Sequence, residues 1–117
     1  MIKRILIVDD EPMILFLLTR YLARLGSEFH VTTCDSGEEA LALDADRPFD
    51  LIMSDCDMPG MTGRDLAQTL ALRRSDVKLV LMSGGDDPAL PGSHFLPKPF
   101  NPDEAWTAIR LALATAY

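Results

Sequence analysis

Short apolar runs alternate with amphipathic segments along the whole length of this chain. Five runs are typical of β-strands: residues 5–8, 29–33, 50–54 and 77–82, and a short stretch around Phe95 and Leu96. The first, third and fourth runs lack an alternation of apolar and polar residues, which is expected of strands covered on both faces. Strands that alternate with helical segments predict an α/β fold, with a parallel sheet and crossover helices.

The segments between the runs carry the signals that begin and end helices. The first has a proline in its opening turn and ends at a glycine. The next two begin with a hydroxyl residue followed three positions later by an acid, and the last begins with an Asn-Pro pair. Helices are therefore predicted from about Glu11 to Leu25, from Ser36 to before Pro48, over 63–74 and from Asn101 onward, with Pro12, Gly26, Glu39, Thr62, Asp65, Pro102 and Glu104 as the signals.

The connection between the fourth and fifth runs departs from this pattern. Residues 84–94 read GGDDPALPGSH, which is rich in glycine and proline and has no helical periodicity. A parallel crossover usually needs a dozen residues or more and contains a helix. We therefore expect the fourth helix to be shortened or missing.

Composition and charge narrow the class of protein. The 117 residues fit one domain, and 48% hydrophobic with 25% charged residues is ordinary for a globular protein. The sequence predicts neither a membrane span nor an export signal, so we expect a cytoplasmic protein. A formal charge of −7 disfavours direct binding of nucleic acid. Cys34 and Cys56 lack the spacing of a zinc site and are expected to be reduced thiols.

Polar residues follow the predicted strands where each strand ends. Because the carboxyl ends of parallel strands meet at one edge of the sheet, these residues are expected to converge there. Several carboxylates brought together favour a shared divalent cation, and Mg²⁺ fits because it prefers a few carboxylates with water and phosphate oxygens. The converging residues are Asp9, Asp10 and Glu11 after the first strand, Asp55 and Asp57 after the third, Ser83 after the fourth, and Lys98 after the fifth.

These residue types are suited to phosphoryl transfer. Asp55, at the end of its strand, is the expected nucleophile, and attack of a carboxylate on phosphorus gives an acyl phosphate. The ammonium of Lys98 and the hydroxyl of Ser83 would hold the remaining phosphoryl oxygens. Pro59 and Gly60 turn the chain away directly afterwards, which keeps such a site open.

Four stretches resemble the motifs of response-regulator receiver domains of two-component signalling. They are IVDDEP (7–12), LIMSDCDMPGMTG (51–63), VLMSGG (80–85) and FLPKPF (95–100). The four follow the order of the family and cover essentially the whole chain, so residues 1–117 are expected to form a single receiver domain. The resemblance implies a flavodoxin-like (βα)5 sandwich with a parallel sheet of strand order 2-1-3-4-5.

The resemblance also implies roles for individual residues. Asp55 would accept a phosphoryl group from a histidine kinase or a histidine phosphotransfer protein. Asp10 would bind Mg²⁺ directly, Asp9 through the water shell, and Asp55 and the backbone carbonyl of Asp57 would complete the protein ligands. Ser83 and Lys98 would bind the phosphoryl oxygens, Ser83 and Phe95 would act as switch residues, and the Lys98–Pro99 peptide would be cis. Such a domain is no enzyme beyond its own phosphorylation and dephosphorylation, and its signal would leave through a downstream protein.

Two other functions remain as alternatives. Asp55 and Asp57 also match the DxD spacing of haloacid-dehalogenase-like phosphatases, with Asp86 and Asp87 as later acids. In that family, however, the pair closes the first strand and the lysine precedes the final acids, whereas here the pair follows the third strand and Lys98 comes last. The second alternative is a receiver-like module that binds partners without switching, because the missing helix affects the usual output surface.

Two helices carry apolar residues beyond their core faces. Residues of this kind on a lone domain indicate either a protein-binding face or a wide core. A homodimer through the first and last helices is one hypothesis, and packing within the domain is the other. The residues concerned are Leu15, Phe16, Leu22, Trp106, Leu113 and Tyr117.

Overall fold

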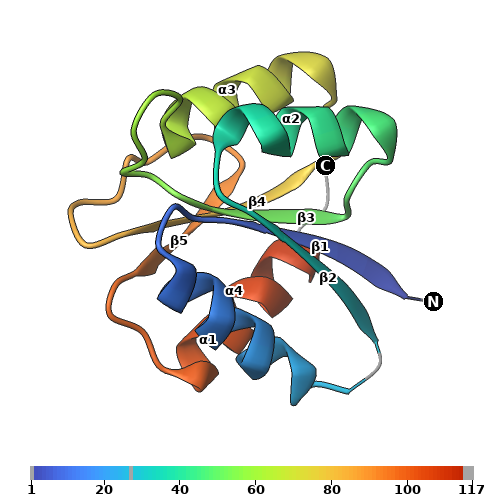
Figure 1. Cartoon of the computed structure of the whole chain (residues 1–117), viewed down its shortest axis with the longest axis vertical. Helices are drawn as coiled ribbons and strands as arrows, with labels where there is room; N and C mark the ends of the chain where they lie inside the picture. The colour runs from blue at the N-terminus through green and yellow to red at the C-terminus, as the bar shows by residue number, and fades with distance from the viewer. Residues whose placement is uncertain (1, 27, 115–117) are drawn as a thin grey trace.

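Five parallel strands form one sheet in the order β2-β1-β3-β4-β5 in the computed structural model, which describes residues 2–26 and 28–114. Figure 1 shows α2 and α3 together on one face of the sheet, and α1 and α4 on the other. The predicted flavodoxin-like topology is confirmed. The elements are β1 Lys3–Val8, α1 Pro12–Ala23, β2 Phe29–Cys34, α2 Gly37–Asp46, β3 Leu51–Asp55, α3 Gly63–Arg73, β4 Lys78–Ser83, β5 Ser93–Pro97 and α4 Pro102–Ala114.

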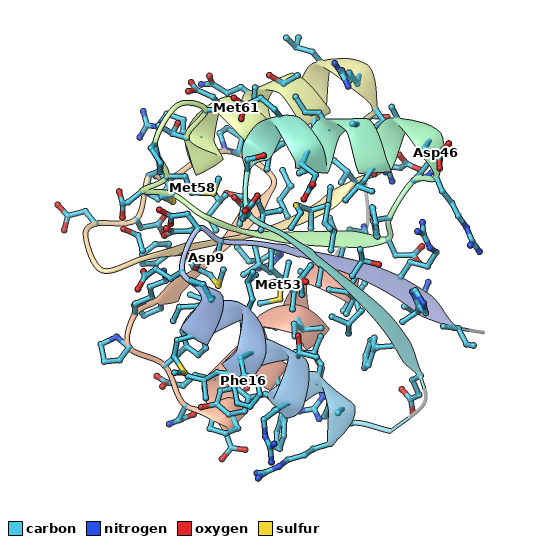
Figure 2. The ribbon with its side chains drawn as sticks, viewed as in Figure 1. Asp9, Phe16, Asp46, Met53, Met58 and Met61 are labelled. Atoms are coloured by element: carbon cyan, nitrogen blue, oxygen red, sulfur yellow. The ribbon has the colours of Figure 1, made fainter. Side chains whose placement is uncertain are left out.

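The three central strands are buried because both of their faces are covered. Alternate residues of β1 belong to two different cores: Ile5 and Ile7 face α1 and α4, whereas Leu6 and Val8 face α2 and α3. Figure 2 shows the same division with the labelled methionines, since Met53 lies in the layer of α1 and α4 while Met58 and Met61 lie on the side of α2 and α3. Continuous apolar runs therefore supply both cores at once.

The helices α2, α3 and α4 begin at the predicted capping residues. The Ser36 hydroxyl accepts a hydrogen bond from the Glu39 amide at 3.1 Å, which caps α2. Thr62 and Asp65 cap α3 reciprocally, with both distances 3.1 Å. Asn101 and Glu104 do the same before α4, at 2.9 and 2.8 Å. These bonds satisfy amides that have no partner inside the helix, and so they fix where each helix starts.

The ends of several elements differ by one or a few residues from the predicted ones. The third strand is Leu51–Asp55 and not 50–54, and the fourth is Lys78–Ser83 and not 77–82. The first helix ends at Ala23, and the chain turns over the next three residues to Gly26, where φ is +92°. The two strand shifts follow from ladder hydrogen bonds of the sheet, which the apolar pattern does not define.

Residues 84–92, all of which the structure describes, form a loop with no helix, as predicted for this connection. The chain adopts positive φ there at Ala89 and at Gly92. None of the helices within residues 2–26 and 28–114 has the length and apolarity needed to cross a membrane.

The apolar residues beyond the predicted core faces have different positions. Leu22 is buried, and Leu15 and Leu113 pack against the core between the sheet and α1 and α4. The Trp106 indole N–H donates to the Tyr21 carbonyl at 2.9 Å and so joins α4 to α1. Phe16 is 56% exposed, and Tyr117 lies outside the described residues. The burial of Leu22 therefore agrees with packing within the domain and not with a protein-binding face.

Candidate functional site

The predicted site residues meet at the carboxyl edge of the sheet. Asp9 follows β1 directly, Asp55 is the last residue of β3, Ser83 is the last residue of β4, and Lys98 follows β5. Asp9, Asp55 and Ser83 are all buried, with at most 3% of each residue exposed. The parallel ladder brings them together because β1, β3, β4 and β5 are neighbours in the sheet.

Lys98 lies at the centre of this site. Its ammonium nitrogen is 3.0 Å from Oδ2 of Asp9 and 3.2 Å from Oδ1 of Asp55. Its backbone amide donates to the Ser83 carbonyl at 2.8 Å, which extends the pairing between β4 and β5 by one bond. The Lys98–Pro99 peptide is cis, as the resemblance implied. The backbone therefore fixes the position from which the lysine reaches both carboxylates.

Burial and charge shift the pKa values of two of these groups. Burial raises the pKa of Asp9 above its ordinary value, although the Glu11 amide and Lys98 oppose the rise. For Lys98, burial lowers the pKa, but the hydrogen bond with Asp9 and the charges of Asp9 and Asp55 outweigh burial and raise it. The two carboxylates therefore stabilise the charged form of Lys98, and the Glu11 amide and Lys98 both stabilise the anionic form of Asp9 against the effect of burial.

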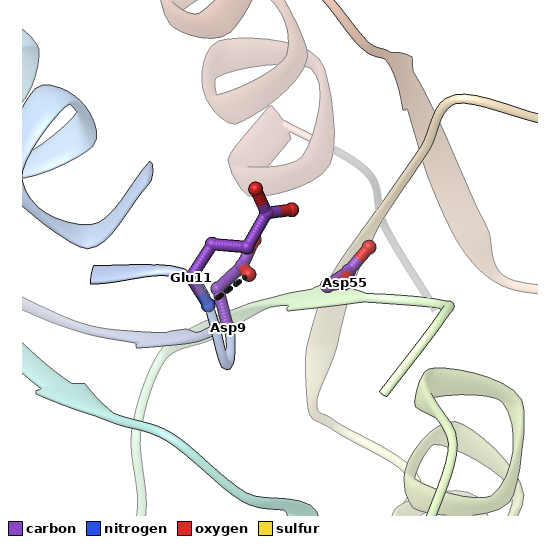
Figure 3. Close-up of side chains that lie close together, drawn as sticks. All are labelled: Asp9, Glu11 and Asp55. Carbon is purple, nitrogen blue, oxygen red and sulfur yellow. Dashed lines mark hydrogen bonds between the residues drawn. The ribbon is translucent and has the colours of Figure 1, made fainter. Parts of the chain in front are cut away.

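Three carboxylates form a group that can hold a metal ion. One oxygen from each of Asp9, Glu11 and Asp55 lies within 4.8 Å of the others (Figure 3). The Glu11 amide donates to Oδ1 of Asp9 at 2.9 Å, and this bond turns the chain after β1 (Figure 3). Asp10 is exposed and lies outside the group, so its assignment as the direct ligand stays a prediction. All donors are oxygens, which suits a hard cation such as Mg²⁺.

Asp57 contacts the site through its side chain. The Ser83 hydroxyl donates to Oδ2 of Asp57 at 2.8 Å and accepts from the Gly85 amide at 2.9 Å. Both bonds hold the hydroxyl on the side of the 84–92 loop. The sequence predicts that Glu11 and Asp57 lie at this edge of the sheet, but the hydrogen bond from Ser83 to Asp57 could not be inferred from spacing.

The start of α3 packs directly against the strand end that carries Asp55. The Gly63 amide donates to the Cys56 carbonyl at 3.2 Å, and the Cys56 amide donates to the Met82 carbonyl at 2.8 Å. A Cβ atom at position 63 would collide with the backbone oxygen of Asp55 and lie 2.8 Å from Cα of Cys56. Glycine is thus required here for a close backbone approach, which holds Asp55 in place.

Phe95 lies on the edge strand at some distance in sequence from the carboxylates. It is half-buried, pairs in register with Leu81, and lines a cavity of about 340 Å³ together with Leu111 of α4. Its neighbour Leu96 is buried in the core. An edge position with free space beside it leaves room for a change of rotamer, and the predicted switch role of Phe95 stays a prediction.

The arrangement is suited to transfer of an anionic group to a carboxylate. Asp55 supplies an anionic oxygen at a fixed position, Lys98 supplies a positive charge 3.2 Å from it, and Ser83 supplies a hydroxyl donor. In a partly water-excluded crevice, such preformed charges and donors stabilise a transferring phosphoryl group more strongly than they would in water.

Comparison with known proteins agrees with this chemistry. The family model described as "Response regulator receiver domain" matches residues 5–110. Among curated proteins, the two-component response regulator ARR14 of Arabidopsis thaliana is 37% identical over 110 residues, which cover 86% of this chain. The alignment spans 28% of that relative, so this chain matches only part of its length.

Solved structures give the same family. Chemotaxis protein CheY4 of Vibrio cholerae superposes with a TM-score of 0.87 at 27% identity, over 97% of this chain and all of CheY4. Response regulator TrrA of Thermotoga maritima, in complex with Mg²⁺ and BeF, superposes at 0.86 with 32% identity, over 96% of this chain and all of TrrA. TrrA in complex with the histidine kinase ThkA superposes at 0.84 with 31% identity, over 97% of this chain and all of that chain.

Proposed function

Because this chain belongs to the receiver domains of response regulators, we propose that Asp55 accepts a phosphoryl group from a histidine kinase or a histidine phosphotransfer protein. In this reaction a carboxylate oxygen of Asp55 attacks phosphorus, the bond from phosphorus to the imidazole nitrogen breaks, and an acyl phosphate forms. The kinase complex of TrrA supports a partner of this class.

The position of Lys98 is the single observation that carries the proposal. One ammonium lies within 3.2 Å of two buried carboxylates that come from different strands, β1 and β3. Asp9 holds the lysine, and the lysine faces Asp55. A charge held in this way needs no rearrangement to stabilise the negative phosphoryl oxygens as they arrive.

The acidic group is proposed to bind Mg²⁺, with Asp55 supplying a carboxylate oxygen, Asp9 acting through the water shell, and Asp57 supplying its backbone carbonyl. Glu11 joins Asp9 and Asp55 in the group that the structure brings together, whereas Asp10 is a ligand on the resemblance alone. When bound, the ion supplies positive charge to the phosphoryl oxygens. The complex of TrrA with Mg²⁺ and BeF supports this cofactor.

Phosphorylation is proposed to act as a switch through Ser83. Its hydroxyl now donates to Asp57, and it must give up this bond in order to donate to a phosphoryl oxygen on Asp55. Phe95, with free space beside it, is proposed to move in response. The changed surface alters affinity for a downstream protein, because a ligand shifts an equilibrium only by binding the two states differently.

The remaining assignments follow from this switch. We propose that residues 1–117 act as one receiver domain and turn over no substrate apart from the domain's own phosphorylation and dephosphorylation. The free thiols Cys34 and Cys56 suit the reducing cytoplasm, where we place the reaction. A homodimer through α1 and α4 stays a prediction, for which Phe16 is the exposed candidate.

The test compares the parent chain with Asp55→Asn and, as a matched control, Asp46→Asn, which changes an exposed acid on α2 (Figure 2). Amide NMR spectra are recorded with Mg²⁺ and then with beryllofluoride, and labelling by a small acyl phosphate is measured in parallel. We expect one decaying label per chain, and shifts reaching Ser83 and Lys98, in the parent and in Asp46→Asn only.

Two other outcomes would identify the alternatives. Steady release of phosphate from assorted phosphomonoesters would indicate the phosphatase, which membership of the receiver family already disfavours. Labelling at Asp55 without shifts at Ser83, Phe95 or Lys98 would indicate a receiver that does not switch. Labelling of Asp55→Asn at the parent level would contradict the assignment of the acceptor.

A further inference from the structure

A second group of polar side chains lies at the amino edge of the sheet, at the opposite end from the acidic group. Arg4 is on β1, His30 is its register partner on β2, and Arg47 directly follows α2. Figure 2 shows the two ends through Asp9 and Asp46, which lie on opposite sides of the molecule. The three residues of the second group all carry nitrogen donors.

Strand periodicity brings these side chains together. Leu6 of β1 packs in the core under α2 and α3. Side chains two apart in a strand share a face, so Arg4 projects toward α2 as well, and the parallel register places His30 beside it. The end of α2 adds Arg47, and the three residues line a cavity of about 210 Å³ together with Ile2. At about 30 Å³ for each water, this space equals about seven waters, which is room for a small polyatomic anion.

The guanidinium of Arg4 is held in a fixed position. Its Nη1 donates to the carbonyls of Arg47 and Pro48 at 2.8 and 2.7 Å. Its Cζ lies 4.2 Å from the ring centroid of Phe49, which is itself buried. These contacts occupy Nη1 and one face of the planar group. Donors fixed in this way lose little freedom when a ligand binds, so more of the interaction energy remains as affinity.

The other edge of this guanidinium has a donor without a partner. Nε of Arg4 is buried and has no hydrogen-bond partner among the described residues. Nε and Nη2 point from the same edge, and a guanidinium edge of this kind binds phosphate or carboxylate in a bidentate way. The bonds to the end of α2 explain Nη1 but not this edge. An unpaired buried donor costs free energy, which a ligand with two acceptor oxygens would recover.

The charge of the lining selects an anion. None of the four lining residues is acidic, although the whole chain carries −7. Two nearby acids lie outside the lining: Asp46 is exposed, and Oδ2 of Asp50 accepts from the backbone amide of Arg4 at 2.7 Å. Two permanent positive charges and one imidazole therefore line a common space. A phosphate group, with about −1.5 to −2 charges and three acceptor oxygens, matches more of these donors than a carboxylate does.

We propose that the cavity lined by Arg4, His30 and Arg47 binds a phosphate group, carried by a small molecule or by a phosphorylated residue of a partner. Nε and Nη2 of Arg4 hold two of its oxygens, and the side chains of His30 and Arg47 bind the third. The proposal goes beyond phosphorylation of Asp55 and does not depend on it, because the two sites lie at opposite edges of the sheet.

The test follows amide NMR shifts of the chain during titration with sodium phosphate in magnesium-free buffer, with sodium chloride at matched ionic strength as the reference. A phosphoserine tripeptide, and the same tripeptide without phosphate, separate a phosphate on a protein from a free one. The variants are Arg47→Gln and His30→Ala, both at exposed positions. Arg24→Gln is the matched control, because Arg24 is the exposed residue at the end of α1 as Arg47 is at the end of α2. Asp55→Asn shows whether binding is independent of the phosphorylation site.

We expect saturable shifts at the amides of Arg4, His30 and Arg47, in the parent and in Asp55→Asn alike. Arg47→Gln should weaken binding by about tenfold, since it removes a charge-assisted hydrogen bond, and His30→Ala by about threefold. Arg24→Gln should change binding by less than about twofold, because an exposed charge outside the cavity is screened by salt. Tighter binding of the phosphotripeptide than of free phosphate assigns the group to a partner protein, and equal or weaker binding assigns it to a small molecule.

Three results would overturn the proposal. The first is a set of shifts that grow linearly with phosphate or that chloride reproduces at the same ionic strength. The second is equal weakening by Arg47→Gln and Arg24→Gln, because net charge alone would then explain the binding. The third is a set of shifts confined to residues around Lys98, because phosphate would then occupy only the phosphorylation site.

Discussion

Lys98 and Arg74 are both largely buried cations, but the charges around them differ. Nη1 of Arg74 lies 2.7 Å from Asp44, and Nη2 donates to the Phe49 carbonyl at 2.9 Å. Asp44 also accepts from the Phe49 amide at 2.9 Å, so a single buried anion meets a single cation. Arg74 has one further partner, Asp76, which is 78% exposed at its side chain.

Around Lys98, two buried carboxylates and the exposed Glu11 share one ammonium. An excess of buried negative charge of this kind lowers stability in the absence of a ligand. In the Arg74 cluster, by contrast, one buried anion is balanced by one cation. We infer that the Arg74 cluster ties the segment before β3 to the ends of α2 and α3, and that the Lys98 cluster is retained for what it binds. Removing one acid from each cluster should therefore change stability in opposite directions.

Asp44→Asn should have the largest effect of these changes. It leaves Arg74 near the core without a buried counterion, and breaking a buried pair on one side typically lowers the unfolding free energy by about 3 kcal/mol. Urea unfolding measures this loss, and labelling at Asp55 should remain stoichiometric. Asp46→Asn, two residues on and exposed, is the control. A loss of stability no larger than that of the control would contradict a structural role for the pair.

Asp55→Asn should raise the unfolding free energy by about 1 kcal/mol in magnesium-free buffer, because it removes one of two neighbouring buried charges and keeps an acceptor for Lys98. The same substitution abolishes labelling. Urea unfolding of the parent and the variant, with and without Mg²⁺, measures the change. If Asp55→Asn were destabilised as much as Asp44→Asn, the two clusters would be equivalent and the comparison would fail.

Stability should also depend on pH through Asp9. Burial raises the pKa of Asp9 above 3.8, so the folded state holds this proton more tightly than the unfolded chain does. The contribution of Asp9 is full below pH 3.8 and is lost as the pH rises through the pKa of the folded state. Asp9→Asn should therefore gain stability relative to the parent across this window. Urea unfolding over a pH series without Mg²⁺ measures the difference, and parallel curves would contradict it.

The sequence predicts the layout of this protein because its strongest signals are local. Apolar runs define the strands, the Thr62 and Asp65 cap begins α3, and the glycine-proline connection indicates the missing helix. Parallel strands then bring Asp55 and Lys98 together without any further information. The sequence places both Asp10 and Glu11 near Asp9, and the structure brings Glu11 into the acidic group, with the Glu11 amide donating to Asp9 in the turn. A choice between neighbouring residues depends on side-chain geometry that no periodicity encodes.

A substitution at Asp57 is expected to have the smallest effect within the Lys98 site. The side chain of Asp57 competes with the phosphoryl oxygens for the hydroxyl that the switch needs. Asp57→Ala should free Ser83 and tighten binding of beryllofluoride by about threefold, since one exchanged hydrogen bond contributes about 0.5–1.5 kcal/mol. Asp86→Ala removes the same charge from the same cavity and is the matched control. Titration of both variants with beryllofluoride in excess Mg²⁺, followed at the Ser83 amide, separates the two effects. Equal tightening in both variants would mean that charge alone matters and that the bond from Ser83 to Asp57 does not restrain the switch.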